Sequence, residues 1–192
     1  MKKFIFSFSW IFFNFYILFA FPPDTIWTRV YGTNSDEYGR SVLETGDGGY
    51  IVSSKWGNYI YLLKTDENGD TLWKRGYNAN LEMIGDMTFQ KTNDGGYVIA
   101  GTRNYDFCIF KVDSLGNPLW ERVANIVGDD RASAISSAPD GGFIIVGFAS
   151  YRIGILRIDQ YGNILWTKVY RPGGFYYYPY SISQTPDNGF II

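Results

Sequence analysis

The chain has 192 residues, a formal net charge of −2, an aromatic content of 19% and 22 glycines. It contains no histidine and a single cysteine, Cys108. This excludes histidine-dependent base catalysis, Ser-His-Asp triads, ordinary zinc sites and intrachain disulfide bonds. Lysine and arginine form no basic run, so we expect no nucleic-acid partner. Abundant aromatic residues and glycines favour an all-β protein with many tight turns.

The first 21 residues have the layout of a secretory signal peptide. Lys2 and Lys3 precede 18 mostly apolar residues, 4–21, and Ala20 supplies a small side chain near a cleavage point. The alternative is an uncleaved anchor, because 18 apolar residues nearly span a bilayer. Pro22 and Pro23 break the segment and favour cleavage. We therefore expect export to the cell surface, the extracellular space or the periplasm, and no membrane contact beyond this segment.

Two phrases recur at nearly constant spacing along residues 22–192. A tryptophan preceded by Leu or Ile occurs at Trp27, Trp73, Trp120 and Trp166. The phrase Asp-Gly-Gly-aromatic, with one Asp-Asn-Gly variant, begins at Asp47, Asp94, Asp140 and Asp187. The interval between copies is always 46 or 47 residues. A fixed period of this size indicates a repeat architecture.

Each period holds four strand-like runs separated by turn residues. In the first full unit the runs are residues 41–45, 50–54, 60–65 and 71–77. Four short strands in such a period are typical of a β-propeller blade. We predict one all-β propeller domain over residues 22–192, with three full blades at residues 38–77, 85–124 and 131–170. Partial strands at residues 25–31 and 180–192 are expected to belong to another blade.

A lone four-stranded sheet cannot bury both of its faces, so each blade needs neighbours. We expect the four recurring tryptophans to pack between blades as core residues rather than to stack against a ligand. Known propellers usually have at least four blades. We therefore expect this chain to be a fragment of a longer propeller, whose further C-terminal blades would pair with this part.

Residues 66–70, with the sequence DENGD, are similar to the start of a calcium loop. Asp66, Asn68 and Asp70 alternate around a glycine. In the other copies the third residue is Leu115 or Tyr161, which cannot bind calcium. All copies keep an aspartate and a glycine, at Asp66, Asp113, Asp159, Gly69, Gly116 and Gly162. We therefore predict a hairpin turn, with no metal site and no cofactor. An ion site confined to the first copy is the alternative.

Two other features have a simple structural interpretation. Asp-Gly-Gly could be taken for a phosphate-binding loop, but it lacks the following helix and the Lys-Ser/Thr pair of such loops. We interpret it as a second hairpin turn. Cys108 lies in the strand-like run DFCIFKV, and we expect it to be a small buried apolar residue.

The repeat resembles a family of exported bacterial and archaeal proteins. Their units combine W-x-[KR]-x-Y-G, DGG[YF] and K-[LV]-D-x-x-G-[ND]-x-[LI]-W. Here the motifs are WTRVYG at 27–32, TGDGGYIVSS at 45–54 and KTDENGDTLW at 64–73, with copies at 91–120 and 138–166. The resemblance covers nearly all of residues 24–192. It implies propeller blades in secreted, often cell-surface proteins, some with a sorting domain for type IX secretion, and it implies no catalytic residues. Ala124, Asn125 and Asn188 depart from the pattern.

A weaker resemblance is to quinoprotein propellers, whose blades carry a D-x-x-[TN]-G-x-x-x-W docking motif. Residues 64–76, KTDENGDTLWKRG, fit that motif locally. Those enzymes need a quinone cofactor and a calcium site, often with a vicinal cysteine pair, and the sequence shows none of these. Blade packing alone explains the motif.

The segment that follows each tryptophan strand differs strongly between copies, and such loops often carry binding sites. The copy at residues 171–180, RPGGFYYYPY, contains adjacent aromatic residues that cannot all point into one core. Aromatic rings with hydroxyl groups suit sugar faces or peptide partners. The candidate binding residues are Phe175, Tyr176, Tyr177, Tyr178 and Tyr180. The alternative is that these rings pack against further blades.

Together these features predict a secreted or cell-surface propeller that acts as a non-enzymatic binding or scaffold module for a glycan or a protein. One alternative is part of a propeller enzyme, quinoprotein-like or glycan-active, whose catalytic elements lie outside this fragment. The other is a scaffold in envelope assembly.

Overall fold

The computed structural model describes residues 27–32, 37–56, 59–78, 88–171, 173–174 and 176–192. The predicted signal peptide and Phe175 lie outside the described residues. Within these ranges, no helix is long and apolar enough to cross a membrane.

The described chain folds into three four-stranded antiparallel sheets and one small two-stranded sheet, which makes it an all-β, propeller-like protein. The first blade contains β1 (Tyr38–Glu44), β2 (Tyr50–Trp56), β3 (Tyr59–Thr65) and β4 (Thr71–Asn78). The second contains β5 (Thr88–Lys91), β6 (Tyr97–Arg103), β7 (Asp106–Val112) and β8 (Pro118–Ala124). The third contains β9 (Asp130–Ser137), β10 (Phe143–Ala149), β11 (Arg152–Ile158) and β12 (Ile164–Tyr170). The small sheet contains β13 (Ser183–Gln184) and β14 (Phe190–Ile191).

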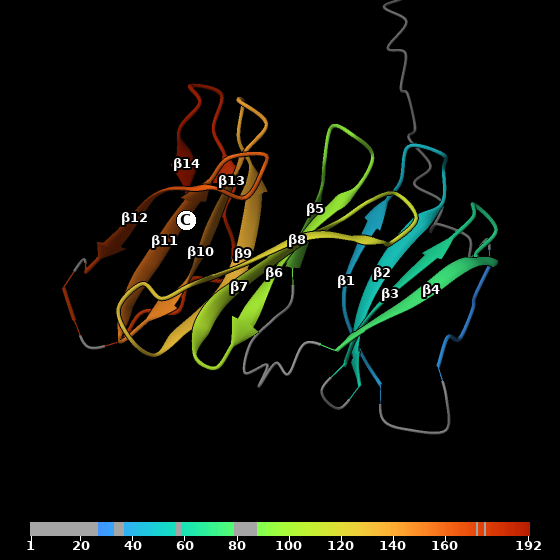
Figure 1. The fold of residues 1–192 in the computed structure, drawn as a ribbon, viewed down its shortest axis with the longest axis horizontal. Helices are drawn as coiled ribbons and strands as arrows, with labels where there is room; N and C mark the ends of the chain where they lie inside the picture. The colour runs from blue at the N-terminus through green and yellow to red at the C-terminus, as the bar shows by residue number, and fades with distance from the viewer. Residues whose placement is uncertain (1–26, 33–36, 57–58, 79–87, 172, 175) are drawn as a thin grey trace, which may run out of the picture.

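Within each blade the strands pair in chain order, and the sheets lie side by side in chain order from blue to red (Figure 1). The strand that opens each unit, β1, β5, β9 or β13, contacts its counterpart in the next unit. The last strand, β4, β8 or β12, lies at the opposite edge of its sheet. This radial order, with first strands adjacent, is the arrangement of propeller blades.

The apolar core lies between the blades rather than within one sheet. One cluster joins β2 and β3 of the first blade to β5, β6 and β7 of the second. Another joins the second and third blades, and a smaller one joins the third blade to Ile182 and Phe190. Side chains of β6 alternate between two clusters, since Tyr97 and Ile99 belong to one and Val98 and Ala100 to the other.

Two ends of the blades differ in what they carry. At the end that we call the turn end lie the Asp-Gly-Gly turns and the turns that join the third and fourth strands. At the opposite end, the loop end, lie the β6–β7 and β10–β11 turns, the connection from β8 to β9, and the described residues that follow β12 (Figure 1). Because antiparallel neighbours reverse direction at each turn, this division holds in the second and third blades, whose turns are described.

The partial strands are shorter than the sequence suggests. Residues 25 and 26 lie outside the described residues, and residues 27–31 form no strand, because their backbone pairs with no strand in the described part of the chain. Their contacts with the first blade are made by side chains, among them those of Trp27 and Tyr31. Of the region 180–192, only β13 and β14 pair, over two residues each. Within residues 85–124 the sheet begins at Thr88, and residues 85–87 lie outside the described residues.

Candidate functional site

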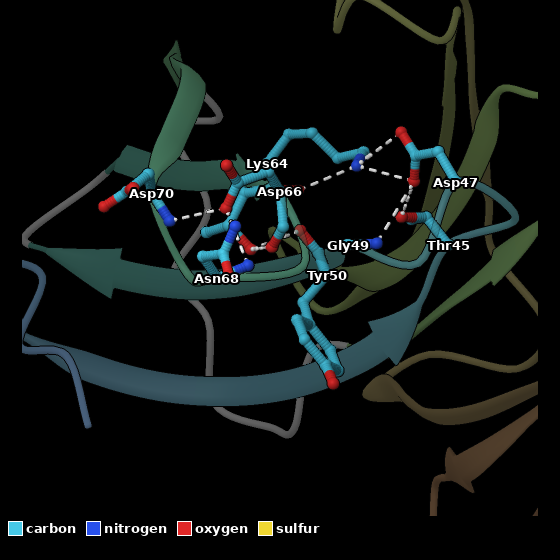
Figure 2. Close-up of polar contacts among 9 residues, drawn as sticks. Thr45, Asp47, Gly49, Tyr50, Lys64, Asp66, Asn68 and Asp70 are labelled. Carbon is cyan, nitrogen blue, oxygen red and sulfur yellow. Dashed lines mark hydrogen bonds and ion pairs between the residues drawn. The ribbon is translucent and has the colours of Figure 1, made fainter. Parts of the chain in front are cut away.

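The turn between β3 and β4, like its copies, is closed by an aspartate that accepts backbone hydrogen bonds. Asp66 Oδ1 accepts from the N–H groups of Asn68 at 2.9 Å and Asp70 at 2.8 Å (Figure 2). Asp113 and Asp159 make the same two bonds within their own turns. These carboxylates therefore cap turns, as the turn interpretation expects. Among the described residues, no group of three or more His, Cys, Asp or Glu side chains could hold a metal ion.

A tryptophan from the preceding unit covers the glycine of each such turn. All three glycines have φ near +80°, and a Cβ atom on any of them would lie within 3.0 Å of an indole ring. The pairs are Trp27 with Gly69, Trp73 with Gly116, and Trp120 with Gly162. Glycine is thus required both for the backbone conformation and for the contact with the ring. Trp166 has the equivalent position in β12, but it covers no such turn in the described structure and is 38% exposed.

A tyrosine four residues after the tryptophan completes two of these contacts. The hydroxyl groups of Tyr31 and Tyr77 donate to the carbonyl oxygens of Gly69 at 2.5 Å and Gly116 at 2.7 Å. Burial raises the pKa of Tyr77 to about 12. In the third copy Ala124 replaces the tyrosine, and the Nε of Arg122 donates to the Gly162 carbonyl at 3.1 Å instead.

The aspartate of each Asp-Gly-Gly phrase forms an ion pair with a basic residue 17 positions later. Asp47 pairs with Lys64 at 2.9 Å, Asp94 pairs with Lys111 at 2.5 Å, and Asp140 pairs with Arg157. Figure 2 shows the Asp47 pair together with the hydroxyl of Thr45, which donates to the same carboxylate. Sequence reasoning missed these pairs, although the constant Asp-to-basic spacing was a signal that could have revealed them.

These ion pairs are half-buried, since the cation is buried and the carboxylate is largely exposed. Hydrogen bonds from Thr45 and Lys64 hold the pKa of Asp47 well below its usual range. For Asp94, partial burial acts to raise the pKa, but hydrogen bonds from Lys111, Thr92 and Gly96 outweigh it and lower the pKa to about 2. The turn end is therefore a set of repeated structural contacts.

The loop end of the third blade instead carries an aromatic cluster. Phe148 at the end of β10 stacks with Tyr178, with ring centroids 5.1 Å apart and an interplanar angle of 11°. Tyr151, in the β10–β11 turn, packs edge-to-face against Tyr176 at 5.1 Å and against Phe148 at 5.7 Å. Tyr176 and Tyr178 remain 64% and 54% exposed. The cluster therefore holds its rings in fixed orientations and still presents them to solvent.

The turn that carries Tyr151 has an uncommon backbone. Ser150 and Tyr151 have φ values of +44° and +69°, the conformation of a two-residue hairpin turn that usually contains glycine or asparagine. The Ser150 side chain fixes the turn, because its Oγ donates to the carbonyl oxygen of Val127 and accepts from the N–H of Asp129, both at 3.1 Å. A tyrosine with positive φ costs about 1 kcal/mol or more, and such residues concentrate at functional sites.

A pocket of about 250 Å³ opens beside the cluster. It is lined by Ser150, Tyr151, Arg152, Arg171 and Tyr176. A second, shallower hollow of about 650 Å³ lies at the loop end of the second blade. Its lining residues are Asn104, Tyr105, Asp106, Asn125, Gly128, Asp129 and Arg131. Both hollows are bordered by a tyrosine with positive φ, Tyr151 in one and Tyr105 in the other.

The structure brings together some of the residues suggested by the aromatic run. Tyr176 and Tyr178 join the cluster, whereas Tyr180 is 79% exposed and has no ring partner within the described chain. The Tyr177 hydroxyl is buried and has no hydrogen-bond partner among the described residues. Sequence reasoning missed Phe148, Tyr151 and the pocket-lining residues Arg152 and Arg171. The dipeptides Asn-Tyr and Ser-Tyr, at equivalent positions in two units, were an available signal for Tyr151. Cys108 is buried, as predicted, and burial raises the pKa of its thiol to about 12.

The comparisons with known proteins inform the fold. No family model and no curated protein sequence matches the chain. Among solved structures, the fold is similar to the crystal structure of a protein of unknown function from Bacteroides caccae, with a TM-score of 0.56 and 18% sequence identity. The match covers 83% of this chain and 54% of that chain, so this chain spans about half the length of that protein. At this identity the similarity concerns the propeller-like fold alone.

Proposed function

We propose that this chain is a non-enzymatic binding module of an exported propeller protein, and that it binds a glycan at the loop end of its third blade. The observation that carries the proposal is the aromatic cluster, in which Tyr176 and Tyr178 are exposed while Tyr151 and Phe148 fix their ring planes. Pre-oriented aromatic faces bind the apolar faces of sugar rings at little entropic cost. The signal-peptide pattern of residues 1–21 supports export.

The test is binding of the purified chain to a glycan array, followed by titration calorimetry with the best glycan. The double variant Tyr176→Ala, Tyr178→Ala should weaken binding by about tenfold or more, because two ring contacts of about 0.5–1.5 kcal/mol each are lost. The matched control is Tyr161→Ala, because Tyr161 is 65% exposed in the same blade but lies at the turn end. It should leave the affinity unchanged.

Three results would contradict the proposal. Equal loss of affinity in the Tyr161→Ala control would show that binding does not depend on the aromatic cluster. Recovery of cleaved or oxidised glycan after incubation would show turnover and favour the enzyme alternative. If the array shows no glycan binding at all, the proposal fails in favour of a protein partner.

A further inference from the structure

The pocket at the loop end of the third blade is lined by two arginines, Arg152 and Arg171. The last residue pair of the β11–β12 ladder in this direction is Ile153 with Tyr170. Arg152 precedes Ile153 and Arg171 follows Tyr170, so the two arginines occupy the next facing positions. Like charges at facing positions of neighbouring strands repel each other and destabilise the hairpin.

Neither guanidinium has a carboxylate partner among the described residues. The acidic side chain of the adjacent loop, Asp129, is already engaged, because both its oxygens accept from Arg131 at 3.0 Å. The ion pairs of the third blade's turn end involve other residues, Asp140 and Arg157. The positive charge of the pocket is therefore uncompensated within the described part of the chain.

The equivalent positions of the other blades do not share this feature. In the second blade the ladder ends at Phe107 with Ala124, and the next facing residues are Asp106 and Asn125. The Asn125 amide donates to the Asp106 carboxylate at 2.6 Å, so these two facing side chains form a hydrogen bond with each other. In the first blade the equivalent residues, Tyr59 and Asn78, are uncharged partners in the β3–β4 ladder. Of the three described blades, only the third has two cations at these positions.

We infer that Arg152 and Arg171 bind the carboxylate or sulfate groups of an acidic glycan whose sugar rings lie against Tyr151 and Tyr176. This inference rests on the proposed function and names the chemical class of the glycan. Guanidinium groups bind planar anions through paired, charge-assisted hydrogen bonds, and an anion between the two arginines removes their mutual repulsion. The whole chain has a net charge of −2, so its overall charge gives a polyanion no attraction, and the two arginines supply a local one.

The experiment compares two polymers of one backbone, polygalacturonate and its fully methyl-esterified form, by titration against the wild-type chain. The acidic polymer should bind at least about tenfold more tightly, and this preference should shrink as salt is raised from 50 to about 500 mM. The double variant Arg152→Gln, Arg171→Gln should lose the preference. The charge-matched control is Lys91→Gln, Lys168→Gln, which removes two positive charges outside the pocket and should keep it. Dextran sulfate against dextran then distinguishes sulfate from carboxylate recognition.

A second variant separates loss of binding from loss of folding. Arg152→Asp, Arg171→Asn installs the residue pair of the second blade, so it should raise the thermal midpoint while it abolishes binding of the acidic polymer. Polygalacturonate should raise the midpoint of the wild-type chain and leave that of this variant unchanged.

The outcomes separate this inference from the proposed function. Equal binding of the acidic and esterified polymers, insensitive to both arginine variants, overturns the acidic-glycan inference and leaves glycan binding standing. Tighter binding of polyglutamate than of any acidic polysaccharide overturns it in favour of an acidic protein. Failure to bind any polymer, acidic or neutral, removes the proposed function as well.

Discussion

The turn end repeats the same contacts from unit to unit, whereas the loop end differs from blade to blade. At the turn end, three units repeat the same contacts: an aspartate caps the turn, a tryptophan covers its glycine, and an Asp-to-basic ion pair lies beside it. At the loop end the facing pairs differ in every blade, being Tyr59 with Asn78, Asp106 with Asn125, and Arg152 with Arg171. The tryptophan–glycine contacts of the turn end join neighbouring units, whereas the facing residues of the loop end vary from blade to blade.

The largest expected effect concerns the tryptophans that cover the turn glycines. Trp120→Ala removes the ring that lies on Gly162 and packs against the core between the second and third blades, and should lower the free energy of unfolding by about 2–4 kcal/mol. Trp166→Ala removes the same residue type from the same strand position without a covered turn, and should cost less than about 1 kcal/mol. Urea denaturation followed by circular dichroism measures both. Equal losses would contradict this prediction, because they would mean that strand position rather than the inter-blade contact sets the stability.

The next effect separates backbone strain from the ring contact. Gly162 and Gly95 have φ values of +83° and +81°, but only Gly162 has an indole ring against the position of a Cβ atom. Gly95→Ala should cost about 1 kcal/mol for the left-handed conformation, and Gly162→Ala about 2–3 kcal/mol because the Trp120 ring must also move. The difference between the two free energies of unfolding measures the inter-blade part. If Gly95→Ala costs as much as Gly162→Ala, the ring contact contributes nothing.

A smaller effect depends on pH. The pKa of Asp94 is lowered to about 2 in the folded chain, so its pair with Lys111 stabilises the fold above the ordinary aspartate pKa of about 4. That stability is lost as the pH falls through about 2. Because the Asp94 side chain is 57% exposed, solvent screening limits the contribution to about 1 kcal/mol.

Asp94→Asn should therefore destabilise the chain at pH 7 and should differ much less from wild type near pH 2. Thermal or urea unfolding across this pH range measures the difference. A constant difference at all pH values would assign the effect to lost hydrogen bonds alone.

The smallest expected effect lies at the loop end. Tyr180→Ala should change the free energy of unfolding by less than about 0.5 kcal/mol, because its ring is 79% exposed. A loss comparable with that of Trp120→Ala would show that the 176–180 segment also supports the fold. The same urea titration tests it.

The sequence predicted the blades well because each motif occurs in several copies that can be compared with one another. The first unit was expected to begin at residue 38 and end at 77, and its sheet runs from Tyr38 to Asn78. Leu115 and Tyr161, in the later copies, favoured a turn over a calcium loop at Asp66, and the hydrogen bonds of these turns agree with that interpretation.

The loop end was less predictable for a physical reason. The stacking of Tyr178 on Phe148, 30 residues earlier, depends on how the connection returns to its own blade, and periodicity carries no information about such a path. The facing arginines depend on the exact register of β11 against β12, which includes a bulge between Arg157 and Ile158. A pattern with period two cannot locate a bulge.

The alternation of β6 between two apolar clusters has a consequence for how the molecule unfolds. Because Ile99 contributes to the first cluster and Val98 to the second, the central blade cannot open without exposing both. Such nearest-neighbour coupling makes the repeats behave as a one-dimensional cooperative array. Amide hydrogens of β6 and β7 should therefore exchange more slowly than those of β1 or β12. A destabilising substitution in one blade should speed amide exchange in the neighbouring blade more than in the blade beyond it.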